Sequence, residues 1–295
     1  MDRTKAGAGL IACLLLCGCS HPSPDRAIRV GSKNFTEQVV LGEIVAQHLE
    51  HKLHRTVERR LNLGGTLLAH QALVSGEIDL YPEYTGTALT AVLKESPAVM
   101  DTTAVLARTR SEYLRRFKVE WLDPLGIDNG FAMVVRGPEA RRRRLESLSD
   151  AAGVDEGWTL GAGYEFEQRA DGLAALKRVY QLRFSPAPRS MDLGLLYQAL
   201  EHKQVDMIAA NATDGLLSKM DLKVLTDDRH AFPPYQVSIA VREESLRTFP
   251  GLRAALLDLS DRFTNRKMQA LNYEVDGKHR SATQVAAEFL KEQGL

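Results

Sequence analysis

Cysteine is scarce in this sequence and confined to one end of it. The chain of 295 residues has three cysteines, Cys13, Cys17 and Cys19, and no cysteine follows them. A folded body that begins beyond them therefore has no disulfide and no cysteine-ligated metal site available to it. A chain of this length can bury a large hydrophobic core, in one domain or in two domains of ordinary size.

An excess of charge of either sign is also lacking. Lys and Arg together number 38, Asp and Glu together number 38, and the formal net charge is zero. This balance argues against a dedicated nucleic-acid-binding protein, which normally has a basic excess. The main concentration of charge is the run Arg141 to Arg144, which follows Gly137-Pro138. We interpret it as a solvated loop or helix start rather than as a docking surface for an acidic partner.

Long apolar runs are missing after the N-terminus, and the one near it is short. Arg3 and Lys5 precede the apolar segment Ile11–Leu16, and Leu16-Cys17-Gly18-Cys19 ends it. The segment is too short to span a membrane and is typical of a secretory signal. Leu-x-Gly-Cys resembles a bacterial lipobox, which implies cleavage before Cys19 and lipidation of its thiol. The alternative is an ordinary signal peptide with incidental cysteines. Residues 1–19 are thus predicted as the signal and 20–26 as a polar tether.

Common catalytic motifs are absent. The sequence has no Gly-x-Ser-x-Gly, no His-Glu-x-x-His, no Walker A motif and no Gly-x-Gly-x-x-Gly. Three histidines recur at the end of a predicted helix: His48, His51 and His54. Because no acidic ligand set accompanies them, we interpret them as a solvated helix face rather than a metal site. Carboxylates such as Asp206 and Asp214 are interpreted as capping groups rather than an acid/base pair. We predict no metal, no cofactor and no catalytic residue.

A β-loop-α pattern repeats through the first third of the chain. Strand 27–31 leads to a helix with Thr36 as its N-cap, and strand 56–63 leads to a helix that begins at Thr66. A third strand lies within Gly76–Thr87 and stops at a proline and glycine corner. The repetition predicts a largely parallel sheet with ligand-binding groups at the carboxyl ends of its strands.

Two later segments share one pattern, an aromatic residue followed by an apolar run that ends at an arginine, and they divide the chain. Phe131 enters one apolar run that ends at Arg136, and Tyr235 leads into another that ends at Arg242. A self-contained α/β pattern lies between them. We therefore predict an α/β, two-lobed fold in which 27–131 and 236–295 form lobe 1 and 132–235 form lobe 2. Two parallel crossing strands would join the lobes as a hinge, with a ligand cleft between them.

The predicted cleft gathers seven residues from strand ends and the hinge: Lys33, Tyr84, Thr87, Phe131, Arg169, Asn211 and Tyr235. Three aromatic rings suit a cationic or apolar group, because a quaternary ammonium is attracted to ring faces. Lys33, Thr87 and Arg169 suit an anionic end, and arginine offers a carboxylate a bidentate fork. Each residue alone is more often structural, and their shared location favours binding.

Several stretches in consistent order resemble one protein family: Gly31–Glu37, Glu83–Thr87, Glu165-Phe166, Arg169–Gly172, Thr213–Gly215 and Phe232–Tyr235. The family comprises the extracytoplasmic substrate-binding proteins of ABC importers for glycine betaine, choline and related osmoprotectants. The likeness runs from about residue 28 to near the C-terminus. It implies a two-lobed periplasmic-binding-protein fold (type II) that closes around its ligand and delivers it to a membrane permease.

The resemblance also implies roles for individual residues. Three match positions that hold a betaine carboxylate: Lys33, Thr87 and Arg169. Three match positions of an aromatic cage around trimethylammonium: Tyr84, Phe131 and Tyr235. The chain departs from the family at Asn211, where relatives often have tyrosine, and Phe131 replaces a common tyrosine. Loss of one cage wall weakens a cation–π site by on the order of 0.5–2 kcal/mol.

The resulting expectation is a monomeric, periplasmic or otherwise extracytoplasmic binding protein anchored to the membrane through Cys19. Its ligand would be glycine betaine, choline or a similar molecule, its partner an ABC permease, and it would neither bind nucleic acid nor need a cofactor. Two alternatives use the same cleft: a secreted enzyme with Asp or Glu as acid/base, and a sensory subunit that reports ligand to a membrane receptor.

Overall fold

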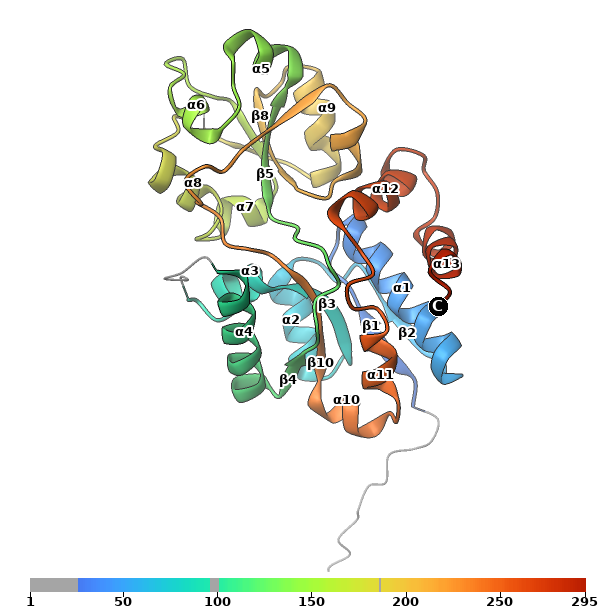
Figure 1. Cartoon of the computed structure of the whole chain (residues 1–295). Helices are drawn as coiled ribbons and strands as arrows, with labels where there is room; N and C mark the ends of the chain where they lie inside the picture. The colour runs from blue at the N-terminus through green and yellow to red at the C-terminus, as the bar shows by residue number, and fades with distance from the viewer. Residues whose placement is uncertain (1–25, 96–100, 186) are drawn as a thin grey trace, which may run out of the picture.

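The structure is a computed structural model, and it describes residues 26–95, 101–185 and 187–295. The predicted signal and Cys19 lie outside these residues. Within the described residues the strands form two five-stranded sheets, one in each half of the molecule (Figure 1). We call the parts that carry them lobe 1 and lobe 2. The residue boundaries predicted for the lobes stay predictions.

The sheet of lobe 1 has the strand order β2-β1-β3-β10-β4. Its strands are β1 (Ile28–Gly31), β2 (Val57–Arg60), β3 (Leu80–Tyr84), β4 (Val119–Trp121) and β10 (Val237–Arg242). β1 is parallel to β2 and β3, as the β-loop-α pattern predicted. β10 is antiparallel to both β3 and β4, so the sheet is mixed rather than largely parallel. The difference arises because β10 belongs to the returning chain and enters the sheet from lobe 2.

The sheet of lobe 2 has the order β7-β6-β8-β5-β9 and is also mixed. Its strands are β5 (Phe131–Arg136), β6 (Leu160–Ala162), β7 (Arg189–Ser190), β8 (Met207–Asn211) and β9 (Leu222–Leu225). β6 pairs in parallel with β7 and β8, whereas β5 pairs antiparallel with β8 and β9. The pairing of β5 with β8 sets Phe131 opposite Asn211, which brings two of the predicted site residues together.

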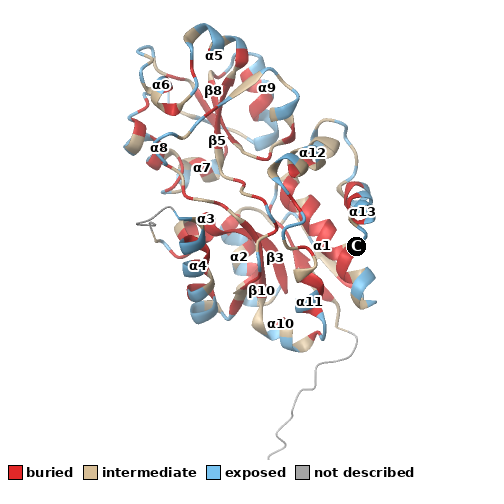
Figure 2. Ribbon diagram, in the orientation of Figure 1, coloured by how far each residue is buried: buried red, intermediate tan, exposed pale blue. Residues whose placement is uncertain are grey.

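Helices cover both sheets (Figure 1). Those of lobe 1 are α1 (Thr36–Leu53), α2 (Thr66–Ser75), α3 (Thr85–Thr87), α4 (Thr102–Phe117), α10 (Glu243–Thr248), α11 (Leu252–Leu257), α12 (Asn265–Asp276) and α13 (Ala282–Gln293). A π-helical segment, η1 (Ala88–Val92), continues α3. The C-terminal helices α11, α12 and α13 pack on α1. Figure 2 shows the buried face of α1 against them.

Lobe 2 is built from shorter helices around its own core. They are α5 (Gly137–Arg143), α6 (Leu148–Ala152), α7 (Tyr164–Gln168), α8 (Leu173–Tyr180) and α9 (Leu196–Glu201), with 3-10 turns η2 (Leu193–Leu195) and η3 (Gly215–Ser218). Buried residues along β5, β6 and β8 pack against α7 and α8. The arginine run lies mainly on α5 and makes ion pairs there, including Arg141 with the exposed Asp221.

Two connecting segments join the lobes, and they run in opposite directions. Asp128 and Gln236 form an antiparallel bridge, and the Asn129 amide donates to the Tyr235 carbonyl at 3.1 Å. The expectation of two parallel crossing strands is therefore wrong. Since the chain leaves lobe 1 through one connection and returns through the other, its two crossings must be antiparallel when they pair.

Two local interpretations also need correction. The residue before the first turn of α1 is Phe35, not Thr36, and it makes no side-chain capping bond. The Thr36 hydroxyl instead donates to Asp276 on α12 at 2.6 Å. His48 does not lie on a solvated face: it is 1% exposed, and its Nε2 lies 2.9 Å from the Ala255 carbonyl oxygen. Burial lowers the pKa of His48, because α11 covers this side of α1.

Candidate functional site

A cavity of about 860 Å³ lies between the lobes. Its walls include the ends of β3 and β8, the first turns of α1 and α7, and the connecting segments. All seven residues predicted for the cleft line it: Lys33, Tyr84, Thr87, Phe131, Arg169, Asn211 and Tyr235. The structure therefore brings together residues that are spread over most of the sequence.

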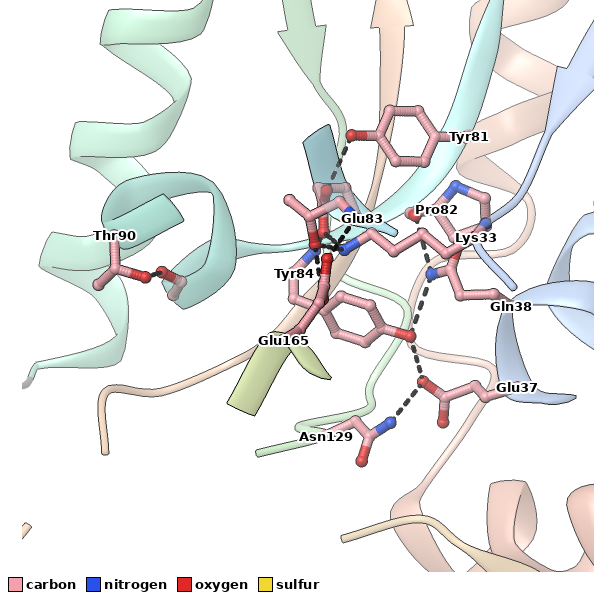
Figure 3. A network of polar contacts seen from close by, with 12 residues as sticks. Lys33, Glu37, Gln38, Tyr81, Pro82, Glu83, Tyr84, Thr90, Asn129 and Glu165 are labelled. Atoms are coloured by element: carbon pink, nitrogen blue, oxygen red, sulfur yellow. Dashed lines mark hydrogen bonds and ion pairs between the residues drawn. The ribbon is translucent and has the colours of Figure 1, made fainter. Parts of the chain in front are cut away.

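Tyr84, the last residue of β3, has a fixed ring. Its hydroxyl donates to Oε1 of Glu37 at 2.7 Å and accepts from Nε2 of Gln38 at 3.0 Å (Figure 3). Phe35 stacks on the ring with centroids 6.1 Å apart, and it also lines the cavity. Burial raises the pKa of Tyr84 well above its ordinary value, so the hydroxyl stays protonated. One cavity wall is thus held in place by two hydrogen bonds and one ring contact.

Glu37 is a buried residue at the lobe junction that sequence reasoning missed. Besides Tyr84, it accepts from Nδ2 of Asn129 in a connecting segment at 2.9 Å. It also accepts from the hydroxyl of Thr213 in lobe 2 at 2.5 Å. Burial raises its pKa. Glu37 and Thr213 stood in two of the stretches that carried the family resemblance, but their contact spans 176 positions in sequence.

Lys33 points its ammonium at internal partners. Nζ lies 2.5 Å from Oε1 of Glu83 and donates to the Thr66 hydroxyl at 3.0 Å. It also lies 4.8 Å from the centroid of the Tyr84 ring. Lys33 and Glu83 are both buried, and Tyr81 donates its hydroxyl hydrogen to the second oxygen of Glu83 at 2.8 Å. The positive charge of Lys33 is therefore balanced inside the protein.

Arg169, just after α7, is likewise paired. Its Nε and Nη2 contact the two oxygens of Asp171 at 2.9 and 2.5 Å. The Tyr235 hydroxyl donates to the same carboxylate at 2.7 Å. Burial by itself would lower the pKa of Arg169, but the hydrogen bond and charge of Asp171 outweigh it and raise that pKa. Burial would raise the pKa of Asp171, and the Arg169 contacts reverse this and lower it.

The remaining rings form an aromatic cluster beside this pair. The Arg169 guanidinium lies 5.0 Å from the centroid of Phe131 and 5.7 Å from that of Tyr235. Phe131 meets Phe166, Phe232 and Tyr235 edge to face, with centroids 4.9, 5.6 and 5.7 Å apart. Sequence reasoning found Phe131 and Tyr235 but not the supporting Phe166 and Phe232, although both lie in stretches that carried the resemblance.

Thr87 and Asn211 supply polar groups on opposite lobes. Thr87 is buried in α3 at the end of the β3 corner. Asn211 ends β8, and its amide Nδ2 lies 3.3 Å from Oδ1 of Asp214. Asp214 also accepts from the Tyr197 hydroxyl at 2.9 Å, and burial raises its pKa to about 6. The position that departs from the family's tyrosine is thus hydrogen-bonded to a partly buried acid.

Glu165 connects the two lobes across the cavity, and sequence reasoning did not assign it to the site. It extends from α7 of lobe 2, and its Oε1 accepts from the Thr66 backbone amide at the start of α2 at 2.6 Å. Its Oε2 accepts from the Thr66 hydroxyl at 3.1 Å. A Cβ on Gly65 would lie 2.5 Å from Oε1, so a glycine at that position lets the carboxylate approach the helix end.

Over residues 26–292 the chain matches the model of the family described as the substrate binding domain of ABC-type glycine betaine transport systems. The chain belongs to this family. The Carnitine transport binding protein OpuCC of Listeria monocytogenes is 34% identical over 288 residues, covering 96% of this chain and 93% of that protein. A glycine-betaine-binding protein of Pseudomonas aeruginosa is 34% identical over 278 residues, covering 91% and 88%.

A solved structure supports the same fold. A crystal structure described as a glycine betaine/carnitine/choline ABC transporter matches this binding protein with a TM-score of 0.76 and 32% identity. The match covers 90% of this chain and 98% of that one. The two-lobed type II binding-protein fold is therefore confirmed, and so is the role of a substrate-binding protein in an ABC import system.

Binding proteins of this family work outside the cytoplasm together with a permease. In the part of this chain that the structure describes, no helix has the length and apolar character needed to cross a membrane. What the site offers is a cavity with rigid aromatic walls, internally balanced basic residues and a carboxylate that spans the lobes.

Proposed function

We propose that this binding protein captures a small molecule with a quaternary ammonium group, either a betaine-like zwitterion or a quaternary amine, and passes it to an ABC permease. One observation carries the proposal: Tyr84, Phe131 and Tyr235 reach a single cavity between the lobes. A weakly hydrated cation is attracted to such ring faces by roughly 0.5–2 kcal/mol for each favourable contact. Relatives named for carnitine and glycine betaine support the same ligand class.

In this proposal the two lobes divide the site between them. Tyr84 and Thr87 come from lobe 1, Phe131 and Tyr235 lie at the connections, and Asn211 comes from lobe 2. The rings contact the ammonium, while the Thr87 hydroxyl and the Asn211 amide bind the ligand's polar end. Lys33 and Arg169 complete the lining. The site is then complete only when the lobes approach each other, as hinge closure requires.

The protein binds without catalysis in this proposal, and it acts as a monomer held at the membrane by lipidated Cys19. A binding protein returns its ligand unchanged, so prolonged incubation followed by mass spectrometry should recover intact ligand. Release of a product would instead support a secreted enzyme. Replacing Cys19 with serine should move the protein from the membrane fraction to the soluble one. An unchanged distribution would contradict the lipid anchor.

The function is tested by isothermal titration of the soluble form, beginning after residue 26, with one panel of ligands. The panel comprises glycine betaine, choline, carnitine, proline betaine and ergothioneine. We expect saturable heat with at least one member and a rise in the thermal unfolding midpoint with the same compound, because only a molecule that binds the folded state stabilises it. An absence of both signals over this panel and a wider set of cations and zwitterions would refute the proposal.

A further inference from the structure

Large apolar side chains on the surface of this protein gather at the mouth of the interlobe cavity. Among the described residues, seven large apolar side chains are exposed. Two of them, Leu114 on α4 and Val224 on β9, belong to elements that contribute nothing to the cavity lining. The other five lie in or beside segments that line the cavity, and we call them the apolar rim: Leu67, Leu68, Tyr164, Leu193 and Leu195.

The part of the apolar rim in lobe 1 lies on α2. The buried residues of this helix recur at the spacing of one helix face: Thr66, Ala69, Ala72 and Leu73. Leu67 and Leu68 fall outside that face and are 59% and 63% exposed. The residue before the helix, Gly65, lines the cavity. Two adjacent leucines on the solvent side of an amphipathic helix add nothing to the core, and such apolar patches mark interaction sites.

The part of the apolar rim in lobe 2 comes from two segments that adjoin. Tyr164 is the first residue of α7 and is 70% exposed, while Leu193 and Leu195 belong to η2. All three line the cavity. A Cβ on Gly163 would lie 2.6 Å from Cδ2 of Leu193, so η2 packs beside the start of α7. Both lobes therefore present apolar groups at the same opening.

A hydrogen-bonded contact between the lobes joins the two parts of the apolar rim. Glu165 follows Tyr164 in lobe 2, and Thr66 precedes Leu67 in lobe 1. The Glu165 carboxylate accepts from the backbone amide of Thr66 at 2.6 Å and from its hydroxyl at 3.1 Å. The apolar rim is thus continuous across the mouth while the lobes are in contact, and it would be divided if they moved apart.

The charges at this opening favour a protein partner over a membrane surface. Of the charged side chains that line the cavity, Lys33 is buried and that of Arg169 is 11% exposed. The more exposed ones are acidic: Asp192 is exposed, and the side chain of Glu165 is 40% exposed. Anionic lipid headgroups attract basic surfaces, so acidic groups beside the apolar rim disfavour adsorption to such lipids.

We infer that the apolar rim is the surface on which the ABC permease docks, and that the contact between Glu165 and Thr66 completes it. This inference rests on the proposed delivery of ligand to a permease, and it holds for any ligand of the proposed class. A ligand enters and leaves through the mouth, so the permease that receives it must cover the surrounding side chains. The matching permease surface is apolar, with basic groups facing Asp192. Because the apolar rim spans both lobes, the permease binds a protein with joined lobes more tightly than one with separated lobes.

The test separates docking from ligand binding. Full-length variants are expressed in host cells from which the native gene has been deleted, and immunoblots equalise their amounts. Uptake of radiolabelled choline and glycine betaine is measured at ligand concentrations that saturate each variant by calorimetry, and the uptake of the deleted cells is subtracted. If another compound of the calorimetric panel is the one that binds, it replaces these two.

The main variant carries both Leu67→Gln and Leu68→Gln. Glutamine keeps the size and helix propensity of leucine while it removes the apolar surface, and neither position lines the cavity. Leu114→Gln is the matched control, since Leu114 is another exposed helical leucine, at 43%, away from the cavity lining. Tyr164→Gln tests the part of the apolar rim in lobe 2.

We expect the double leucine variant to keep its ligand dissociation constant within about twofold of the wild type and to lose at least about fivefold in uptake rate. Tyr164→Gln should also lower the uptake rate at saturating ligand. Leu114→Gln should transport at the wild-type rate. Thermal unfolding verifies that each variant is folded, and all substituted side chains are exposed in the folded protein.

Three outcomes overturn the inference while the proposed ligand class stands. One is transport at the wild-type rate by the double leucine variant. Another is sedimentation of the wild-type protein, but not of this variant, with vesicles of phosphatidylglycerol and phosphatidylethanolamine while uptake is unchanged, which would assign the apolar rim to lipid. The third is a dimer in analytical ultracentrifugation that the variant dissociates without loss of uptake. Failure of every quaternary ammonium compound to bind the wild type refutes the proposed function itself, and the inference with it.

Discussion

The Tyr84 hydroxyl donates to Glu37 at 2.7 Å, and the same carboxylate accepts from Thr213 of the opposite lobe at 2.5 Å. An aromatic wall of the cavity is therefore joined to the junction of the lobes through one buried acid. Figure 3 shows this connection continuing from Glu37 to Asn129 in a connecting segment. The orientation of the Tyr84 ring and the relative position of the lobes consequently depend on each other.

Two substitutions at Tyr84 should separate the contribution of its ring to ligand binding from the contribution of its hydroxyl to stability. Tyr84→Phe keeps the ring and removes a donor from the buried Glu37, so we expect unfolding free energy to fall by about 1–3 kcal/mol. Its affinity for choline should change by less than about threefold. Tyr84→Leu removes the ring and should weaken binding by about tenfold. Urea denaturation and calorimetry measure the two effects, and choline binding by Tyr84→Leu at wild-type strength would contradict the aromatic wall.

Asp214 should make stability depend on pH in a defined direction. Burial raises its pKa from 3.8 to about 6 in the folded protein. The folded state therefore holds this proton more tightly than the unfolded state does. The resulting stabilisation is fully present below about pH 4 and is lost as pH rises through about 6.

Asp214→Asn removes this titration. The unfolding free energy of the wild type minus that of the variant should decrease between about pH 4 and about pH 7, by at most about 3 kcal/mol. Because other groups titrate alike in both proteins, they cancel in the difference. Urea midpoints measured at each pH provide the curve. A constant or rising difference would contradict the raised pKa.

Gly215 should be required for contact between the lobes. A Cβ at this position would lie 2.4 Å from the backbone nitrogen of Tyr273 on α12 and 2.6 Å from its Cα. Backbone atoms cannot turn aside as a flexible side chain can, so Gly215→Ala must push η3 away from α12. We expect a loss of about 1–3 kcal/mol in unfolding free energy.

Gly194 provides the matched control, because a Cβ there has no atom within 4 Å. Gly194→Ala should therefore leave stability within about 0.5 kcal/mol of the wild type. Thermal and urea unfolding of both variants test the contrast. Equal stability of Gly215→Ala and Gly194→Ala would mean that η3 and α12 are not held in close contact in solution.

Arg169 should contribute to stability mainly by balancing the charge of the buried Asp171 carboxylate. Arg169→Met leaves a buried carboxylate without its cation, and we expect a loss of about 3–5 kcal/mol. Adding Asp171→Leu removes the unpaired charge and should restore part of that loss. Calorimetry with choline and glycine betaine provides a second measurement. A loss confined to glycine betaine would instead support the ligand-carboxylate role that the family resemblance implied for Arg169.

Much of the fold and the site could be predicted from local sequence. The alternation of apolar strands with polar loops and helix starts indicated an α/β fold, and the paired runs after Phe131 and Tyr235 marked the two crossings. The seven cavity residues could be gathered because strand ends and connections meet at one edge of each sheet. The short run Arg169-x-Asp171 even contained its own ion pair, although sequence reasoning interpreted only its arginine.

Only the tertiary structure decided strand direction, burial and charge balance. β10 is antiparallel to β3 because the returning chain enters from lobe 2, which no local pattern records. His48 is buried because α11, which follows 207 positions later at Ala255, covers it. Glu165 meets Thr66 across 99 positions, and Lys33 meets Glu83 across 50. Sequence patterns reflect residues that are neighbours along the chain. The charge that a ligand meets is instead the sum of groups that packing brings together from distant segments.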